Sequence, residues 1–144
     1  LARGASALID LSDGLGLDAP RLARASGCGF MIETGSIPLE PALARLVPDR
    51  VEALRHAIHG GDDYQLLATV APRRFAAVHS ALRRAGVSLH RVGRLTSQPD
   101  LYLSSDSGQP PRPWPERGWD PFISLDAPLG RGVGRGAPRE RTRR

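Results

Sequence analysis

The chain has 144 residues, about the length of one domain, and carries a formal net charge of +5. A chain of this length can bury roughly two thirds of the surface that its unfolded state exposes, which is enough for a core. The single cysteine, Cys28, excludes an internal disulfide framework and any zinc site built from cysteines. The apolar runs are too short to cross a bilayer, and no segment is typical of a signal peptide. We therefore expect a cytoplasmic protein with no membrane partner.

The positive charge is concentrated at the C-terminal end. Residues 1–122 contain 14 arginines and 13 acidic residues, a net charge of +1, whereas residues 123–144 contain six arginines and two acidic residues, a net charge of +4. Every cationic residue is arginine, which we interpret as a bias in genomic base composition. The last residues also have almost no large apolar side chains, so we predict a folded domain over residues 1–122 and a disordered tail over residues 123–144.

The first informative stretch places two carboxylates and a hydroxyl within four residues. A buried strand is predicted at residues 7–9, and Asp10, Ser12 and Asp13 follow it. Side chains alternate along a strand, so Asp10 and Ser12 point to one side, and Asp13 can reach the same place from the turn. Crowded carboxylates repel one another unless a cation neutralises them, and their oxygens suit Mg²⁺, particularly Mg²⁺ carried by phosphates. An equally simple interpretation makes Asp13 a helix N-cap and Asp10 a solvated turn residue.

The rest of the chain alternates between helical and strand patterns. Apolar spacing with proline or glycine boundaries predicts helices at residues 18–25, 41–46, 50–58 and 72–85. Asp18 is expected to cap the first of them. Apolar runs predict strands at residues 30–32, 66–70, 87–95 and 100–104, the last two joined as a hairpin. This order predicts an α+β domain in which helices pack on a mixed sheet.

The second informative stretch is Gly60-Gly61-Asp62-Asp63-Tyr64, immediately before the strand at residues 66–70. Two glycines ahead of two acids let the backbone approach a ligand closely and hold carboxylates at the entrance of the strand. A helix C-cap followed by a polar turn would have the same amino-acid sequence. Farther on, the proline-rich residues 109–115 are expected to be extended and to lead to Trp114 and Trp119.

Five short motifs, taken together, indicate a family. They are Asp10-Leu11-Ser12-Asp13-Gly14-Leu15, the helix end at residues 23–27, Ile37-Pro38-Leu39, the segment at residues 60–67 and Gly118-Trp119-Asp120. In this order and spacing, from the first residue to about Phe122, the chain resembles the C-terminal domain of bacterial thiamine-monophosphate kinase. That enzyme is a relative of aminoimidazole ribonucleotide synthetase, so the resemblance implies the fold of the C-terminal domain of that synthetase.

The resemblance also implies an activity, namely direct phosphoryl transfer from ATP to thiamine monophosphate with the assistance of Mg²⁺. Asp10 and Asp13 would bind Mg²⁺, and Ser12 would contact ATP. Asp62 and Trp119 would contact the substrate, although Trp119 could equally be an aromatic anchor of the core. No catalytic acid or base is implied, because the attacking phosphate oxygen is already anionic and the reaction depends on positioning and metal assistance.

The sequence also departs from the family pattern. Asp62 stands where the family usually has Glu, Gln65 replaces a commonly acidic residue, and Pro121 stands where the family often has His. The N-terminal half, which in the family supplies the dimer interface and most of the nucleotide pocket, is not part of this sequence. We therefore expect these 144 residues to be inactive alone, with a missing N-terminal domain as partner and a homodimer as the full-length form.

Two other functions remain as alternatives. Another ATP-dependent member of the superfamily, such as a selenophosphate synthetase or a hydrogenase-maturation protein, would share the fold, but the Gly-Gly-Asp-Asp-Tyr segment disfavours it. An arginine-rich tail could also belong to a nucleic-acid-binding module. The nearly neutral residues 1–122 and the absence of a run of aromatic residues disfavour that function, so we expect no nucleic-acid partner.

Overall fold

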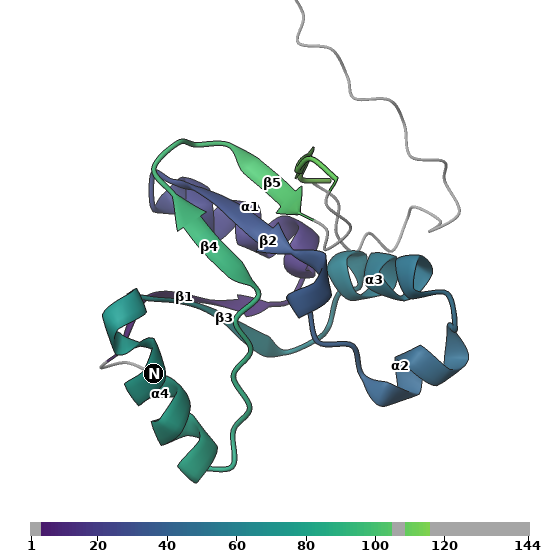
Figure 1. Ribbon diagram of the computed structural model, residues 1–144, viewed down its shortest axis with the longest axis horizontal. Helices are drawn as coiled ribbons and strands as arrows, with labels where there is room; N and C mark the ends of the chain where they lie inside the picture. Colours follow the sequence, from purple (N-terminus) through teal and green to yellow (C-terminus); the bar gives the residue numbers. More distant parts are fainter. Residues whose placement is uncertain (1–3, 105–108, 116–144) are drawn as a thin grey trace, which may run out of the picture.

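The computed structural model describes residues 4–104 and 109–115, which form two sheets around a central helix (Figure 1). The elements in chain order are β1 (Ala5–Leu11), α1 (Leu15–Ala25), β2 (Gly29–Glu33), a 3₁₀ turn (Thr34–Ser36), α2 (Pro41–Leu46), α3 (Arg50–His59), β3 (Gln65–Val70), α4 (Pro72–Arg84), β4 (Gly93–Thr96), β5 (Leu101–Ser104) and β6 (Arg112–Pro113). No helix in these described ranges is long and apolar enough to span a membrane. Trp119 and the predicted tail at residues 123–144 lie outside the described residues.

One sheet is a pair of antiparallel strands and the other is mixed. β1 pairs with β3, while the second sheet has the order β4-β2-β5-β6. Within it, β2 is antiparallel to β4 and parallel to β5, and β5 is antiparallel to β6. Helix α1 contacts β1 of the first sheet, β2 of the second and also α3. The prediction of an α+β domain with helices packed on a mixed sheet is confirmed.

The core lies between α1 and the second sheet. Leu15, Ala19 and Ala23 recur at four-residue spacing, which places them on one face of α1, and all three are buried. They pack with Phe30 of β2 and with Trp114, which follows β6. The rings of Phe30 and Trp114 meet edge to face, with centroids 5.0 Å apart and planes at 89°. Such a pair contributes about 0.5–1.5 kcal/mol beyond the burial of its area, so Trp114 ties the end of the described chain to the core.

The predicted hairpin between residues 87–95 and 100–104 is wrong. β4 begins only at Gly93, and β2 lies between β4 and β5, pairing Phe30 with Leu95 on one side and with Leu101 on the other. The connection between β4 and β5 crosses the start of β2, where a Cβ added to Gly29 would lie 2.1 Å from the carbonyl oxygen of Asp100. Turn residues at positions 96–99 could not reveal that a third strand occupies the gap.

The start of α1 also differs from the prediction. The helix begins at Leu15, its N-cap is Gly14 with a φ of 93°, and no side chain caps it. Both Asp18 and Asp13 were considered as caps, and both expectations are wrong, since Asp18 is a buried residue of the first turn. The strand predicted as buried at residues 7–9 is longer and alternates between half-buried and exposed side chains.

Candidate functional site

The two informative stretches of the sequence, about 50 residues apart, lie side by side. The N–H of Asp62 donates to the carbonyl oxygen of Ser12 at 2.8 Å, and the N–H of Tyr64 donates to that of Leu11 at 3.1 Å. These bonds continue the ladder of β1 and β3 beyond the pairing of Leu11 with Gln65. The acidic turn, which we define as residues 10–14, is therefore joined backbone to backbone to the double-glycine segment, residues 60–64.

Glycines make this close approach possible. A Cβ added to Gly14 would lie 2.1 Å from the carbonyl oxygen of Gly60, so a side chain at position 14 would collide with the backbone of the facing segment. The φ of 93° at Gly14 is itself disfavoured for residues with a side chain. Gly60 in turn ends α3, and its N–H donates to the carbonyl oxygen of His56 at 2.7 Å. The start of α1 and the end of α3 consequently meet at the acidic turn.

The double-glycine segment carries backbone strain. Asp62 and Tyr64 have backbone φ angles of 62° and 50°, in the left-handed region that residues other than glycine rarely adopt. A residue held there costs of order 1–3 kcal/mol, and such residues concentrate at functional sites. The two bonds to β1 hold these residues in place while their side chains remain exposed, Tyr64 to 80%. Desolvation of the carboxyl group raises the pKa of the intervening Asp63, although the residue as a whole is exposed.

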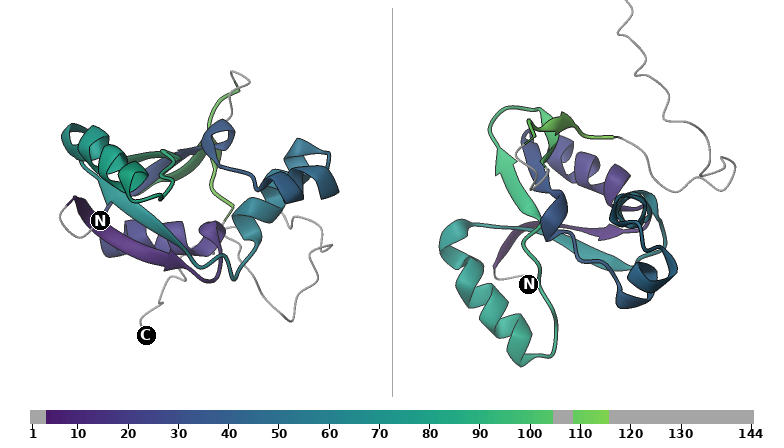
Figure 2. Two further views of the ribbon diagram at one scale, coloured as in Figure 1. Left: turned by 90° about the horizontal axis from the view of Figure 1, so that it is seen from below. Right: turned by 45° about the vertical axis from the view of Figure 1, so that its right-hand side comes forward.

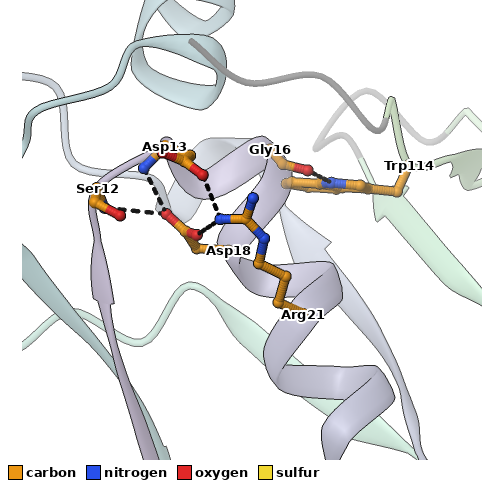
Figure 3. Close-up of polar contacts among 6 residues, drawn as sticks. All are labelled: Ser12, Asp13, Gly16, Asp18, Arg21 and Trp114. Carbon is orange, nitrogen blue, oxygen red and sulfur yellow. Dashed lines mark hydrogen bonds and ion pairs between the residues drawn. The ribbon is translucent and has the colours of Figure 1, made fainter. Parts of the chain in front are cut away.

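A buried carboxylate organises the acidic turn (Figure 3). Asp18 is only 1% exposed, and its Oδ2 accepts the backbone N–H groups of Ser12 at 3.1 Å and Asp13 at 3.0 Å. Its Oδ1 accepts a bond from Nη1 of Arg21 at 2.7 Å, and the same Nη1 donates to Oδ2 of Asp13 at 2.5 Å. Hydrogen bonds to Asp13 and then to Asp18 raise the pKa of Arg21, which keeps the guanidinium charged.

Sequence reasoning missed this pair. Asp18 was expected to cap a helix, and Arg21 was not considered. Asp18 and Arg21 are three residues apart in α1, a spacing that brings side chains together on one helix face, so this spacing was the available signal.

Four of the five expected site residues lie in this region. Asp10 is on the exposed side of β1, opposite Leu66 of β3. Ser12 and Asp13 lie in the turn, and Asp62 is bonded to Ser12 across it. Trp119 is outside the described residues, so the structure does not place it.

Trp114 also contacts the N-terminal end of α1, which begins at the acidic turn. Its Nε1 donates to the carbonyl oxygen of Gly16 at 3.0 Å, across 98 residues of sequence (Figure 3). That carbonyl belongs to the first turn of the helix, and the indole ring is buried. The proline-rich segment therefore anchors the helix that begins at the acidic turn.

The acidic turn offers oxygen donors of the kind that Mg²⁺ prefers. In residues 4–104 and 109–115, no group of three or more His, Cys, Asp or Glu side chains is placed to hold a metal ion. The carboxylates of Asp10 and Asp13 are nevertheless hard oxygen donors, and the guanidinium of Arg21 already places a cation against Asp13. These residues fit an ion that takes most of its ligands from phosphates and water, as Mg²⁺ usually does.

Comparison with known families identifies the domain. The model for the C-terminal domain of AIR synthase related proteins matches residues 1–106. The chain belongs to this family. The likeness to the C-terminal domain of thiamine-monophosphate kinase, and to the fold of the synthetase relatives, is thereby confirmed.

Several relatives of this AIR synthase-like domain are longer proteins named as kinases. Thiamine-monophosphate kinase of Salmonella typhimurium is 40% identical over 93 residues, which are 65% of this chain and 28% of the relative. The crystal structure of the same kinase from Stenotrophomonas maltophilia aligns with a TM-score of 0.63 and 32% identity, covering 72% of this chain and 32% of the other. The chain thus spans about a third of the length of its relatives.

Two further structures show that proteins with different functions share this fold. AaThiL, solved in complex with AMPPCP and TMP, aligns with a TM-score of 0.57 and 27% identity over 78% of this chain and 34% of the other. Escherichia coli HypE, a hydrogenase maturation protein, aligns with a TM-score of 0.60 over 76% of this chain and 34% of the other. At 22% identity it shows only that the fold is shared, so the fold by itself does not select an activity.

Proposed function

We propose that this chain is the metal- and substrate-binding part of a thiamine-monophosphate kinase, which transfers the γ-phosphoryl group of ATP to the phosphate of thiamine monophosphate. The carrying observation is the 2.8 Å hydrogen bond between Asp62 and Ser12, which joins the two motifs. Direct transfer requires the donor and the acceptor to lie next to each other and in line. Thiamine-monophosphate kinases as relatives, and the AaThiL complex with AMPPCP, an analogue of ATP, support this activity.

Each proposed role is the one that the family resemblance implies. Asp10 and Asp13 would hold Mg²⁺, Ser12 would contact the phosphates of ATP, and Asp62 would contact thiamine monophosphate from the facing segment. Mg²⁺ would supply neutralisation of the phosphate oxygens as charge moves between them. Trp119 would present its π-face to the cationic thiazolium ring.

The chemistry needs positioning more than proton transfer. The attacking phosphate oxygen is anionic near neutral pH, so the obstacle is repulsion between two anions. The rigid backbone of the acidic turn and the strained double-glycine segment would hold their side chains in advance, which lowers the entropy cost of alignment. No residue of this chain is therefore assigned as a general base.

Aspartate at position 62 has a structural explanation. The resemblance implies Glu there, and Asp shortens the reach of the carboxylate by one methylene group. The φ of 62° places this residue in the left-handed region, where Asp occurs several-fold more often than most side chains. We propose that the shorter acid suits the strained backbone while it keeps the carboxylate that contacts the substrate.

The rest of the enzyme would come from polypeptide beyond this chain. Because the chain spans about a third of its relatives, we propose that an N-terminal part completes the nucleotide pocket and forms the homodimer. The 144 residues alone would then have no kinase activity. We further propose that the complete enzyme acts in the cytoplasm, where ATP and Mg²⁺ are available.

The proposal can be tested with a chimaera that joins this chain to the N-terminal part of the Salmonella typhimurium relative. The chimaera should form thiamine diphosphate from thiamine monophosphate and ATP, and each part alone should not. The intact relative is the positive control, and circular dichroism checks that the chimaera is folded. A folded chimaera that makes no thiamine diphosphate would contradict the proposed function. Activity of the 144-residue chain alone at the rate of the intact relative would contradict only the proposed need for an N-terminal part.

A further inference from the structure

The shape of the acidic turn depends on one buried side chain. Asp18 is almost inaccessible to solvent, yet hydrogen bonds and an ion pair compensate the negative charge of its carboxylate. It accepts two backbone N–H groups from the turn, pairs with Arg21, and lies in the first turn of α1, where the helix dipole favours a negative charge. A charge buried in this way is retained only when such partners are present, so Asp18 and the turn stabilise each other.

Arg21 joins two carboxylates of different character. A single atom, Nη1, contacts both Asp13 and Asp18. The Asp13 side chain is 43% exposed and that of Arg21 is 49% exposed, whereas that of Asp18 is 1% exposed. The contact with Asp18 is therefore screened less by water and salt than the contact with Asp13.

We propose that Asp18 and Arg21 are positioning residues for the phosphoryl-transfer site: Asp18 fixes the backbone of Ser12 and Asp13, and Arg21 is a built-in cation that a divalent ion displaces from Asp13. This inference depends on the proposed role of Asp13 as a metal ligand. Arg21 can leave Asp13 without losing all its partners, because the bond to Asp18 remains. The same guanidinium repels an incoming cation, so its removal should strengthen metal binding.

The test uses Mn²⁺ as a probe on the ¹⁵N-labelled 144-residue chain. Paramagnetic broadening of the amide signals of Ser12 and Asp13 gives the midpoint concentration of Mn²⁺ binding. Arg21→Gln removes the competing charge and keeps most of the length of the side chain. Mn²⁺ should therefore bind about 3- to 10-fold more tightly, as expected for one unit charge that is largely screened by water. If Arg21 only stabilised the fold, its removal would leave the midpoint unchanged or raise it.

Two further variants sharpen the measurement. Asp18→Asn should weaken Mn²⁺ binding about 3-fold or more. Arg21 then has Asp13 as its only carboxylate partner and competes more strongly with the ion, and the N–H groups of the turn lose a charged acceptor. Arg21→Lys keeps the positive charge, so its midpoint should stay close to that of the parent chain. If Asp18→Asn does not fold, the exposed Arg21 variants still decide the question. Arg84→Gln, which removes an exposed charge from the last turn of α4, is the matched control and should change nothing.

The variant Asp13→Asn separates this inference from the proposed function. If Asp13→Asn abolishes the broadening and Arg21→Gln does not tighten binding, the displacement of Arg21 is refuted while Asp13 remains a metal ligand. If Asp13→Asn leaves the midpoint unchanged, the metal role of Asp13 is refuted, and the displacement of Arg21 with it. The same holds if Mn²⁺ broadens neither amide, either in the parent chain or in the chimaera supplied with AMPPCP.

Discussion

The two sides of the molecule differ in how completely they are packed. Around α1, β2 and β5, apolar side chains such as Ala23, Phe30 and Leu103 are buried in one core. In the β1–β3 pair and in α4, by contrast, no apolar residue is fully buried. Figure 2, like Figure 1, shows α1 and α4 on opposite sides of that pair of strands. We refer to the first part as the packed side and to the second as the open side.

The acidic turn lies on the border between these two sides. Its backbone is held by Asp18 and Trp114 of the packed side, whereas Asp10 and Tyr64 belong to the open side. Leu8 and Leu66, which are 46% and 56% exposed, add apolar surface beside it. Under the proposed function, the N-terminal part of the enzyme would pack against these exposed side chains. The packed side therefore supplies stability, and the open side would supply the surface for assembly of a complete enzyme if the proposed function is correct.

The largest difference between the two sides should appear when an aromatic residue is removed from each. Trp114→Ala deletes a buried ring, its contact with Phe30 and its hydrogen bond to Gly16, so it should cost about 3–5 kcal/mol of unfolding free energy. Tyr64→Ala on the open side should change it by less than about 0.5 kcal/mol. Urea denaturation of the 144-residue chain measures both values. Similar losses for the two variants would remove the distinction between the sides.

In the acidic turn, on the border between the two sides, loss of a charge should lower activity much more than it lowers stability. Asp10→Asn or Asp13→Asn in the active chimaera should lower the rate on the order of 10²-fold or more, because a metal ion held against the phosphates is worth several kcal/mol and each ~1.4 kcal/mol is tenfold in rate. The melting temperature without metal should be unchanged or higher for Asp10→Asn, since repulsion between neighbouring carboxylates is relieved. Asp13→Asn also loses the exposed ion pair with Arg21, so its melting temperature should change little. Excess Mg²⁺ should restore part of the activity. If activity falls only in proportion to stability, these aspartates are structural and the metal assignment is wrong.

The two tryptophans should separate stability from substrate binding. Trp119→Leu in the chimaera should raise KM for thiamine monophosphate while kcat changes less, because a ring that faces the thiazolium contributes to binding in the ground state and in the transition state alike. Steady-state kinetics at saturating ATP measure both constants, with the melting temperature as control. An unchanged KM, or a variant that unfolds as Trp114→Ala should, would identify Trp119 as a second anchor of the core.

The exposed leucines should behave differently in the two contexts. Leu66→Ser in the 144-residue chain should change the unfolding free energy by less than about 0.5 kcal/mol, as expected for an exposed side chain. In the chimaera the same substitution should cost about 1 kcal/mol or more, because the N-terminal part would bury that side chain. Thermal unfolding of both proteins gives the comparison. Equal effects in the two proteins would show that this face stays open.

The smallest expected effect concerns the pH dependence of stability at Asp63. Desolvation raises the pKa of this carboxyl group in the folded state above its value in the unfolded chain. A carboxyl group with a raised pKa favours folding below its unfolded-state pKa, and that contribution is lost as pH rises through the folded pKa. Asp63→Asn should therefore be slightly more stable than the parent at neutral pH, and the advantage should vanish below about pH 4. Thermal unfolding against pH measures it, and Asp49→Asn, which keeps a good N-cap at an exposed site, is the control and should change stability little.

Much of the local structure follows from the sequence by itself. α2 has the predicted bounds, and α3 and α4 differ from prediction by one residue, because their proline or glycine boundaries and apolar spacing act within a few turns of chain. The two motifs of the site were also visible in the sequence, since each is a short run of residues with unusual chemistry. Their nearness in space was implied by the family resemblance and not by the residues themselves.

The tertiary structure decided what depends on distant residues. The placement of β2 between β4 and β5 depends on Gly29, which leaves room for the carbonyl of Asp100 to pass, and no local pattern encodes such a partner. The burial of Asp18 required the whole turn to fold onto one carboxylate, against the usual preference of aspartate for the surface. The left-handed backbone of Asp62 likewise depends on the carbonyl of Ser12, 50 positions earlier, to which its N–H is bonded. Local preferences select helices and turns, whereas strand order, buried charge and backbone strain result from contacts that form only when distant segments pack together.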